Sequence, residues 1–359
     1  MRLAYEVEAI MHNQLTGLLR VDVPVIGGPM AKASEADLCA AVAKAGGLGL
    51  IGAGYMDPAK LTQVYQTSVQ QLDGNDEVHR AVGVGLFNYS CSQELLQAAI
   101  DLKPRAIWLS FGDWDSLATP IKKAGILLIC QVQHLEQVEP ALKAGADIIV
   151  GQSSESGGHG ASPASLLSLI PELVDHVEKL CQKLSIQPTV PVVAAGGITD
   201  ARQMAASFAL GAAGVVLGTR LNATYESVYP EAKKQALVKA GSSASSHPST
   251  IRTTLYDELS GVAWPPAVDG NCLRNGLTAQ YSSQTPLQDA VKQHVKEEHD
   301  KATADNTVDK LVVWSGSSVG LITSIEHAED IVNDLVRDTK LILQKNAQFA
   351  RPKVLGQSS

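Results

Sequence analysis

The first two thirds of the chain repeat one pattern: a short run of β-branched and aliphatic residues, then a loop, then an amphipathic helix. Several of the runs are apolar on both faces, which is typical of strands in a parallel sheet covered by helices. Short connections between alternating strands and helices favour right-handed βαβ units. Eight strands are expected, at Val23–Gly27, Leu48–Gly52, Val82–Leu86, Ala106–Ser110, Ile126–Gln131, Asp147–Gly151, Val190–Ala195 and Gly214–Gly218.

Helical periodicity fills most of the intervals between these strands. Glycines stand just past several periodic segments and are typical helix ends, at positions 46–47, 125, 145 and 211. Ser34, Asp57, Ser92 and Thr199 are predicted to be N-caps. The expected helices are Glu35–Ala45, Pro58–Leu72, Ser92–Leu102, Leu135–Ala144, Pro163–Leu184 and Ala201–Leu210.

Eight βα units favour an α/β fold of one particular kind, a closed (β/α)8 TIM barrel, over an open doubly wound sheet. The doubly wound alternative lacks its fingerprint, because no G-x-G-x-x-G follows the first strand. The repeating pattern stops after the eighth strand, and the more polar residues 225–313 predict a smaller α-rich substrate or lid domain inserted there. Amphipathic spacing from Glu326 to Gln344 predicts the last barrel helix. The barrel is therefore expected to comprise residues 1–224 and 314–359.

Charge and composition exclude several classes of partner. A net charge of −8 and a pI near 5.6 argue against nucleic acid or an anionic membrane, since both require a basic face. No apolar run approaches the about 20 residues of a membrane helix, and no signal-peptide core is visible, so a cytoplasmic location is expected. The cysteines are scattered, without a C-x-x-C pair, which predicts reduced thiols and no metal site, at Cys39, Cys91, Cys130, Cys181 and Cys272.

Active sites of barrels lie at the C-terminal ends of the strands, so the loops that follow the strands carry the functional information. After the sixth strand, Gly157 and Gly158 directly precede His159. Glycine allows the main chain to approach a ligand closely, and imidazole titrates near neutral pH and can move a proton. After the first strand, the segment 27–30 (G-G-P-M) is short enough to lie flat against a planar ring.

A phosphate site is predicted after the last two strands. Gly196–Gly197 follow the seventh strand and Gly218–Thr219 follow the eighth, where barrels often hold phosphate with backbone N–H groups. Arg220 and Lys32 are the only cations near these segments. Amides and helix N-termini would therefore hold the phosphate, which favours a mononucleotide over a pyrophosphate ligand.

Other polar residues of these loops each allow two interpretations. Glu155 is either a second carboxylate of the site or the partner of a helix terminus, and Asp113 either lines the pocket or caps the next helix. His134 either faces the substrate or begins a helix, and Gln131 is a candidate substrate contact on the same strand. Three aromatic residues form either an apolar lid or ordinary interdomain packing, at Tyr256, Trp264 and Trp314.

Taken in order, the motifs resemble the nitronate monooxygenase family, once called 2-nitropropane dioxygenases. The resemblance spans most of the chain. It rests on P-V-I-G-G-P-M (24–30), G-A-D-I-I-V-G-Q-S-S-E-S-G-G-H-G (145–160), V-V-A-A-G-G-I (192–198) and G-V-V-L-G-T-R (214–220), together with A-G-G-L-G-L-I (45–51) and W-S-G-S-S-V-G-L-I (314–322).

The resemblance implies noncovalent FMN, with His159 at the position of the family's catalytic base. It implies oxidation of alkyl nitronates, nitroalkanes included, with O2 to carbonyl compounds and nitrite. Gly28, Pro29 and Met30 would lie along the flavin, while Gln152 and Gly157 would contact its ring system. The remaining implied cofactor-site residues, which include the phosphate contacts, are Gly158, Gly196, Gly197, Leu217, Gly218 and Thr219.

This sequence departs from the family pattern at several positions. Gly85 stands after the third strand where many members carry a flavin-contacting Asn, and Asn88 lies three residues further on. Ser153 and Ser156 replace a common Gly and Ala. One alternative is an NAD(P)H-dependent FMN reductase of quinones or enoyl thioesters, and another is a noncatalytic barrel that binds a phosphorylated metabolite. The sequence leaves the oligomeric state open, a homodimer included.

Overall fold

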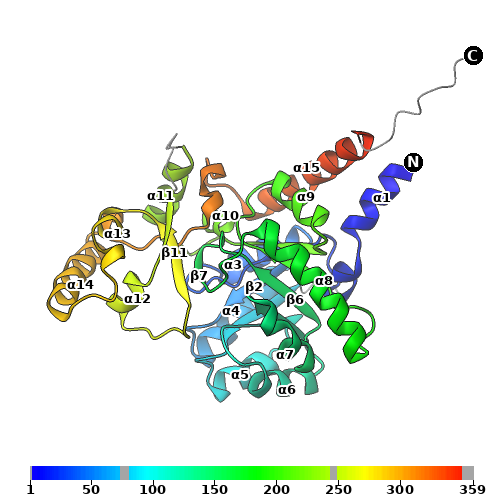
Figure 1. The fold of residues 1–359 in the computed structure, drawn as a ribbon, viewed down its shortest axis with the longest axis horizontal. Helices are drawn as coiled ribbons and strands as arrows, with labels where there is room; N and C mark the ends of the chain where they lie inside the picture. The colour runs from blue at the N-terminus through cyan, green and yellow to red at the C-terminus, as the bar shows by residue number, and fades with distance from the viewer. Residues whose placement is uncertain (1, 73–80, 243–248, 350–359) are drawn as a thin grey trace, which may run out of the picture.

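Eight parallel strands close into a barrel in the order β1-β2-β3-β4-β5-β6-β8-β9 (Figure 1), which confirms the predicted TIM barrel. The computed structural model describes residues 2–72, 81–242 and 249–349. β1 closes the ring by pairing with both β2 and β9. The barrel strands are β1 (Val25–Gly27), β2 (Leu48–Gly52), β3 (Val82–Phe87), β4 (Ala106–Ser110), β5 (Leu127–Val132), β6 (Ile148–Gln152), β8 (Val192–Ala195) and β9 (Gly214–Leu217).

Helices between the strands surround this barrel, and their apolar faces pack onto the outer surface of the strands. They are α3 (Ala36–Lys44), α4 (Pro58–Gln70), α5 (Gln93–Asp101), α6 (Asp115–Lys123), η2 (Leu135–Gln137), α7 (Val138–Lys143), α8 (Leu166–Leu184), α9 (Ala201–Ala209) and α10 (Thr219–Asn222). The long helix α15 (Ala328–Phe349), much later in the chain, packs against α3 and α9, so it completes the helical ring. Among the described helices, none is long and apolar enough to span a bilayer.

Two helices at the start of the chain, α1 (Arg2–Met11) and α2 (Gln14–Leu19), were not expected from the sequence. The Asn13 side chain caps α2 by accepting a hydrogen bond from the backbone N–H of Leu15 at 2.9 Å. Leu15 and Leu19 are fully buried and join the apolar cluster inside the barrel. Helix α2 therefore closes the N-terminal end of the barrel with aliphatic side chains.

Residues between α10 and α15 form a second region that lies to one side of the barrel (Figure 1). Its helices are α11 (Glu231–Ser242), α12 (Leu255–Ser260), α13 (Gly276–Tyr281), η3 (Ser282–Gln284), α14 (Asp289–Ala304), η4 (Val308–Lys310) and η5 (Ser317–Leu321). Its strands are β10 (Thr250–Thr253) and β11 (Asp269–Leu273). A compact apolar cluster that includes Leu255, Leu259 and Leu277 forms its core. The division of the chain into two domains at 225 and 313 stays a prediction.

The strand β7 (Gly158–Gly160) joins the two regions. It belongs to the segment that follows β6, yet it pairs with β11 in an antiparallel three-stranded sheet, with His159 opposite Gly270. The sequence predicted only a loop here, because G-H-G has neither β-branched residues nor alternation of apolar side chains. Its partner strand lies more than a hundred residues away in the sequence.

The predicted helix starts are confirmed at Asp57 and Ser92, whose side chains accept hydrogen bonds from the first turns of α4 and α5. The prediction for Ser34 is wrong, because α3 begins one residue later, after Glu35. The Ser34 hydroxyl instead donates to the carbonyl oxygen of Gly28 at 2.9 Å. Ser34 therefore holds the loop after β1 through a tertiary contact and does not cap α3.

Candidate functional site

The loop after β1 is fixed against the end of β9. The N–H of Gly28 donates to the carbonyl of Leu217 at 2.8 Å, and the N–H of Met30 donates to that of Gly28 at 2.9 Å. Pro29 lies across the end of β3: a Cβ on Gly85 would come within 2.2 Å of the Cβ of Pro29. Glycine at position 85 is therefore required for this packing, which gives a physical reason for its departure from the family pattern.

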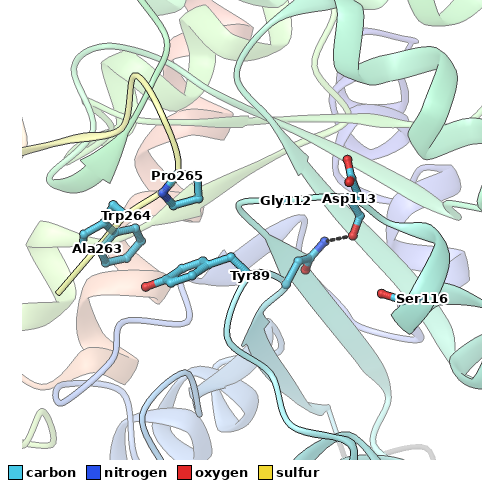
Figure 2. A pocket seen from close by; sticks show the side chains of 8 residues that line it. Tyr89, Gly112, Asp113, Ser116, Ala263, Trp264 and Pro265 are labelled. Atoms are coloured by element: carbon cyan, nitrogen blue, oxygen red, sulfur yellow. Dashed lines mark hydrogen bonds between the residues drawn. The ribbon is translucent and has the colours of Figure 1, made fainter.

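Asn88 does not occupy the place that Gly85 leaves. Its side-chain amide donates to the carbonyl of Asp113 at 3.0 Å, and its buried Oδ1 has no hydrogen-bond partner among the described residues. Together with Tyr89 and Gly112 it lines a hollow of ≈500 Å³ between the barrel loops and the second region. Figure 2 shows this hollow, with Trp264 on the side of the second region.

The interpretation of Asp113 is resolved by the position of α6. This helix begins at Asp115 with Trp114 at the N-cap position, so the prediction that Asp113 caps it is wrong. Asp113 instead lies at the edge of the ≈500 Å³ hollow, near Ser116 (Figure 2). A second hollow of ≈340 Å³ lies on the side of α12, and Trp264 lines both. Neither hollow extends over the glycine-rich loops.

Glycines are concentrated where the loops after β6, β8 and β9 meet, a place we call the junction. A Cβ on Gly157 would lie 2.5 Å from the backbone N of Gly316, and a Cβ on Gly196 would lie 2.4 Å from Ser153 Oγ. Gly196 and Gly197 have φ values of +108° and +69°, which glycine adopts without strain. The backbone can therefore converge here only because side chains are absent.

The donors at this junction suit a small phosphate. The N–H groups of Gly218 and Thr219 begin α10 and have no intrahelical acceptor. A Cβ on Gly218 would meet only Met30 Sδ within 4 Å, at 3.8 Å, so this face of the loop is open. The Ser156 hydroxyl beside Gly196 is buried and has no hydrogen-bond partner among the described residues. Hydroxyl and backbone N–H donors are the groups that bind a phosphate without a strongly basic side chain.

The two cations that the sequence indicated near the junction point elsewhere. The Arg220 guanidinium is buried and pairs with Glu326 at 2.6 Å, while burial lowers the pKa of Arg220. Lys32 Nζ lies over the Tyr55 ring, 5.3 Å from its centroid. Neither Arg220 nor Lys32 therefore contributes a charge to the junction, where the open donors are amides and hydroxyls.

The loop after β8 is tied to the second region. Thr199 was predicted to cap α9, which is wrong, because Asp200 takes that position and accepts a hydrogen bond from Arg202 N. The Thr199 hydroxyl instead bonds Ser318 Oγ at 2.6 Å, on η5. The Thr199 hydroxyl therefore holds the loop after β8 against η5 of the second region.

Glu155 serves the backbone in this structure. Its carboxylate accepts hydrogen bonds from the backbone N–H of Leu166 at 2.6 Å and from Ser153 Oγ at 2.7 Å. Leu166 is the first residue of α8, so the carboxylate satisfies a free helix N–H and interacts favourably with the helix dipole. This contact corresponds to the helix-terminus interpretation of Glu155.

Amides inside the barrel mouth form a chain that reaches the histidine. Gln131 accepts from Ser110 Oγ at 3.2 Å and donates to Gln152 Oε1 at 2.8 Å. Gln133 also donates to Gln152 Oε1, at 2.6 Å, and Gln152 donates to the carbonyl of His159 at 3.1 Å. Gln131 is thus placed to orient Gln152. The sequence did not indicate Ser110, at the end of a predicted strand, or Gln133, two residues past the predicted strand Ile126–Gln131.

His134, the other candidate substrate residue, begins η2. Its backbone N–H donates to Gln137 Oε1 at 3.2 Å, and the N–H of Gln133 donates to the same oxygen at 2.6 Å. This is a helix-start arrangement, as the second interpretation of His134 expected. Direct substrate contact by His134 and Gln131 stays a prediction.

His159 is enclosed by residues of the second region. Its ring stacks on Trp264, with centroids 3.7 Å apart and planes 12° apart, and the Trp314 ring lies 4.7 Å away. Its Nε2 lies 2.8 Å from Asp257 Oδ1 on α12. The His159 side chain is only 12% exposed. No sequence motif indicated Asp257, which is 98 positions away from His159.

Aromatic rings cover the mouth around this histidine. The ring centroid of Trp264 lies 5.3 Å from that of Phe87, the last residue of β3, and 5.2 Å and 5.1 Å from those of Tyr89 and Phe111 on loops of the barrel. Tyr256, by contrast, is buried in the core of the second region. Trp264 thus packs between the second region and the barrel, with edge-to-face contacts to Phe87 and Phe111, and Trp314 lies against the core of the second region. A lid role for these rings stays a prediction.

Comparison with known proteins agrees with this geometry. A sequence model of the family described as nitronate monooxygenase matches residues 12–79 and 77–338. Nitronate monooxygenase of Neurospora crassa is 27% identical over 357 residues, which cover 91% of this chain and 91% of that protein. Nitronate monooxygenase npaC of Metarhizium robertsii is 28% identical over 370 residues, covering 93% and 98%.

Solved structures share the same architecture. FabK from Thermotoga maritima superposes with a TM-score of 0.77 at 27% identity, covering 94% of this chain and 98% of that one. Nitroalkane oxidase from Streptomyces ansochromogenes superposes with a TM-score of 0.74 at 21% identity, covering 93% and 100%, and at that identity shows the fold alone. Because the family model covers most of the chain and the barrel carries the expected loops, the chain belongs to the nitronate monooxygenase family and is a flavin-dependent oxidoreductase.

Proposed function

We propose that this chain binds FMN at the barrel mouth and oxidises alkyl nitronates, including those formed from nitroalkanes, with O2 to carbonyl compounds and nitrite. The observation that carries the proposal is His159, a nearly buried imidazole that the strand β7 holds beside the glycine-rich loops. The related proteins named nitronate monooxygenase support the same substrate class.

The residues present fit FMN. Gly28, Pro29 and Met30 would lie along its ring, with Gln152, Gly157 and Gly158 on the side of the histidine. The phosphate would be held by backbone N–H groups and by the free Ser156 hydroxyl, near Gly196, Gly197, Leu217, Gly218 and Thr219. Bound FMN would supply the one-electron oxidation of the nitronate that oxygen completes.

His159 would act on the substrate proton. For a neutral nitroalkane, the imidazole accepts the α-proton, and the electron pair of the broken C–H bond moves into the nitro group to give the nitronate. Imidazole suits this role because its basicity lies near ambient pH. Trp264 and Trp314 exclude water from the ring, which strengthens its interaction with an anionic product.

Turnover of the variant His159→Ala tests the proposal. We expect turnover of nitroalkanes to fall by about 10²- to 10⁴-fold, the usual contribution of a general base, while the purified protein remains yellow. The matched control is His12→Ala, since His12 is exposed near the opposite end of the barrel. Unchanged turnover in His159→Ala would remove the histidine from the mechanism.

Anaerobic flavin reduction distinguishes the competing predictions. Bleaching of the bound flavin by nitronates, with no fast reaction with NADH or NADPH, is the expected result. Rapid bleaching by a pyridine nucleotide alone would replace the proposal by the reductase alternative. Protein that contains no flavin and takes up no FMN would favour the noncatalytic barrel. Mass spectrometry of the released cofactor identifies it as FMN or as another flavin.

A further inference from the structure

The contact between His159 and Asp257 has the geometry of a positioning pair. The Nε2–Oδ1 distance is 2.8 Å, and the two side chains are 12% and 13% exposed. Solvent does not compete strongly for either group, unlike at an exposed ion pair. In the described part of the chain, no group hydrogen-bonds the other ring nitrogen, Nδ1.

Asp257 has no structural partner that would explain its burial. Its second oxygen, Oδ2, is buried without a hydrogen-bond partner among the described residues. A buried carboxylate with an unsatisfied oxygen opposes folding, and such groups are retained mainly where a site uses them. The adjacent Glu258 differs, because its carboxylate accepts a hydrogen bond from Leu287 N at 2.8 Å and helps to hold the second region together.

The position of the carboxylate is fixed from both sides. Asp257 lies on α12 between two buried residues, Tyr256 and Leu259, so the helix cannot rotate without exposing them. On the other side, pairing of His159 with Gly270 fixes the backbone of the histidine, and stacking on Trp264 fixes its ring plane. The carboxylate therefore meets an imidazole that has little freedom to turn away.

We propose that Asp257 is a positioning residue for His159. It accepts a hydrogen bond from Nε2–H, which leaves the lone pair on Nδ1 to accept the α-proton of a neutral nitroalkane. When the C–H bond breaks, its electron pair moves into the nitro group, the proton goes to Nδ1, and Asp257 remains ionised and stabilises the imidazolium. Carboxylate–histidine pairs set the tautomer in this way in other enzymes. This inference rests on the proposed function.

Two substrates separate positioning from general structural support. A neutral nitroalkane must lose a proton to His159, whereas a preformed nitronate has already lost it. In Asp257→Asn, the amide can donate to Nε2 and favour the wrong tautomer. We therefore expect nitroalkane turnover to fall by about 10²-fold or more, and turnover of the preformed nitronate to fall less than about tenfold.

Matched variants complete the design. Glu258→Gln removes a neighbouring carboxylate of α12 and is expected to leave the ratio of nitroalkane to nitronate turnover unchanged. Asp257→Glu keeps the carboxylate and is expected to restore part of the nitroalkane turnover. If Asp257→Asn lowers both turnovers equally, or neither, Asp257 is not a positioning residue. If Asp257→Asn does not fold, Asp257→Glu decides. Nitroalkane turnover in Asp257→Glu that is no higher than background would then also overturn the proposal.

The tautomer itself provides a readout that is independent of activity. Nitrogen-15 NMR of the histidine ring at about pH 9, where free imidazole is neutral, is expected to show Nε2–H in the wild type and a changed tautomer in Asp257→Asn. Nδ1–H in the wild type overturns the proposal. If the wild type oxidises neither substrate, the proposed function fails, and the NMR result alone then decides whether Asp257 sets the tautomer.

Discussion

The two ends of the barrel are built from different chemistry. At the N-terminal end, α2 inserts Leu15 and Leu19 into the apolar cluster of the barrel interior, where both side chains are fully buried. At the C-terminal mouth, buried polar atoms of Ser156, Asn88 and Asp257 have no partner in the described chain. One end thus contributes stability, while the other keeps hydrogen-bonding capacity that folding alone does not use.

Shortening a side chain of α2 that fills the N-terminal end of the barrel should give the largest change. This substitution should lower the stability of the protein without changing its activity. In Leu19→Ala, loss of a fully buried side chain from the barrel interior is expected to lower the free energy of unfolding by about 2–5 kcal/mol. Urea denaturation followed by circular dichroism measures this change, while kcat and flavin content at a temperature below the transition should stay the same.

The same chemical change on the surface is the control. Leu167 on α8 is 70% exposed, so Leu167→Ala is expected to change stability by less than about 0.5 kcal/mol. If Leu19→Ala also releases flavin from the folded protein, the two ends of the barrel are coupled, and the separation described above is wrong.

A methyl group added where the loops after β6, β8 and β9 meet should weaken cofactor binding, in contrast to the stability effect of Leu19→Ala. In Gly157→Ala, the new Cβ would approach Gly316 N, which must then move and lose its 2.8 Å hydrogen bond to Thr219 Oγ1. We expect FMN affinity to fall by about tenfold, or about 1.4 kcal/mol, as measured by quenching of flavin fluorescence on binding. Gly17→Ala is the control, since nothing lies within 4 Å of its Cβ position. Wild-type affinity in Gly157→Ala would show that this junction does not hold the cofactor.

The smallest effect concerns the second region. Burial lowers the pKa of His299, which packs near Tyr256, and Lys233 and Lys296 act in the same direction while Asp300 opposes them. The unfolded chain therefore binds a proton near pH 6.5 that the folded chain does not, so stability falls as the pH is lowered through this value. We expect His299→Gln to show a smaller decrease in Tm than the wild type between about pH 7 and about pH 5.

His327 provides the control of opposite sign. Its hydrogen bond to Glu226 raises the pKa of His327, so the stability it contributes is present at low pH and is lost as the pH rises through the raised pKa. His327→Gln should therefore lower Tm more at about pH 5 than at about pH 7. If Tm depends on pH in the same way in both variants, the opposite directions given for the pKa shifts of His299 and His327 are wrong.

The sequence predicted the features that depend on local pattern. Apolar runs located all eight barrel strands, and Asp57 and Ser92 cap helices as expected, because a cap depends on residues within one turn. Ser34 and Thr199 had the same local signal, but their hydroxyls bond distant partners instead. Tertiary contacts therefore override propensity at the mouth, where loops from several strands meet.

The unpredicted parts depend on contacts between distant residues. β7 has no strand signal of its own and exists because β11 pairs with it. Asp257 became visible only when folding brought α12 to His159. The helices α1 and α2 were missed because their short apolar faces lie in a stretch of mixed polarity. Motif spacing indicated where the histidine lies, but not what holds it.

The pairing of β7 with β11 constrains how this scaffold can be recombined. A graft that exchanges residues 225–313 for those of a relative replaces the backbone neighbour of His159 together with Asp257 and Trp264. The surroundings of His159 and its proposed positioning residue would then change in a single step. A chimera that aims to alter only the substrate range must keep 254–273 from the parent and place its crossovers within the helices further out.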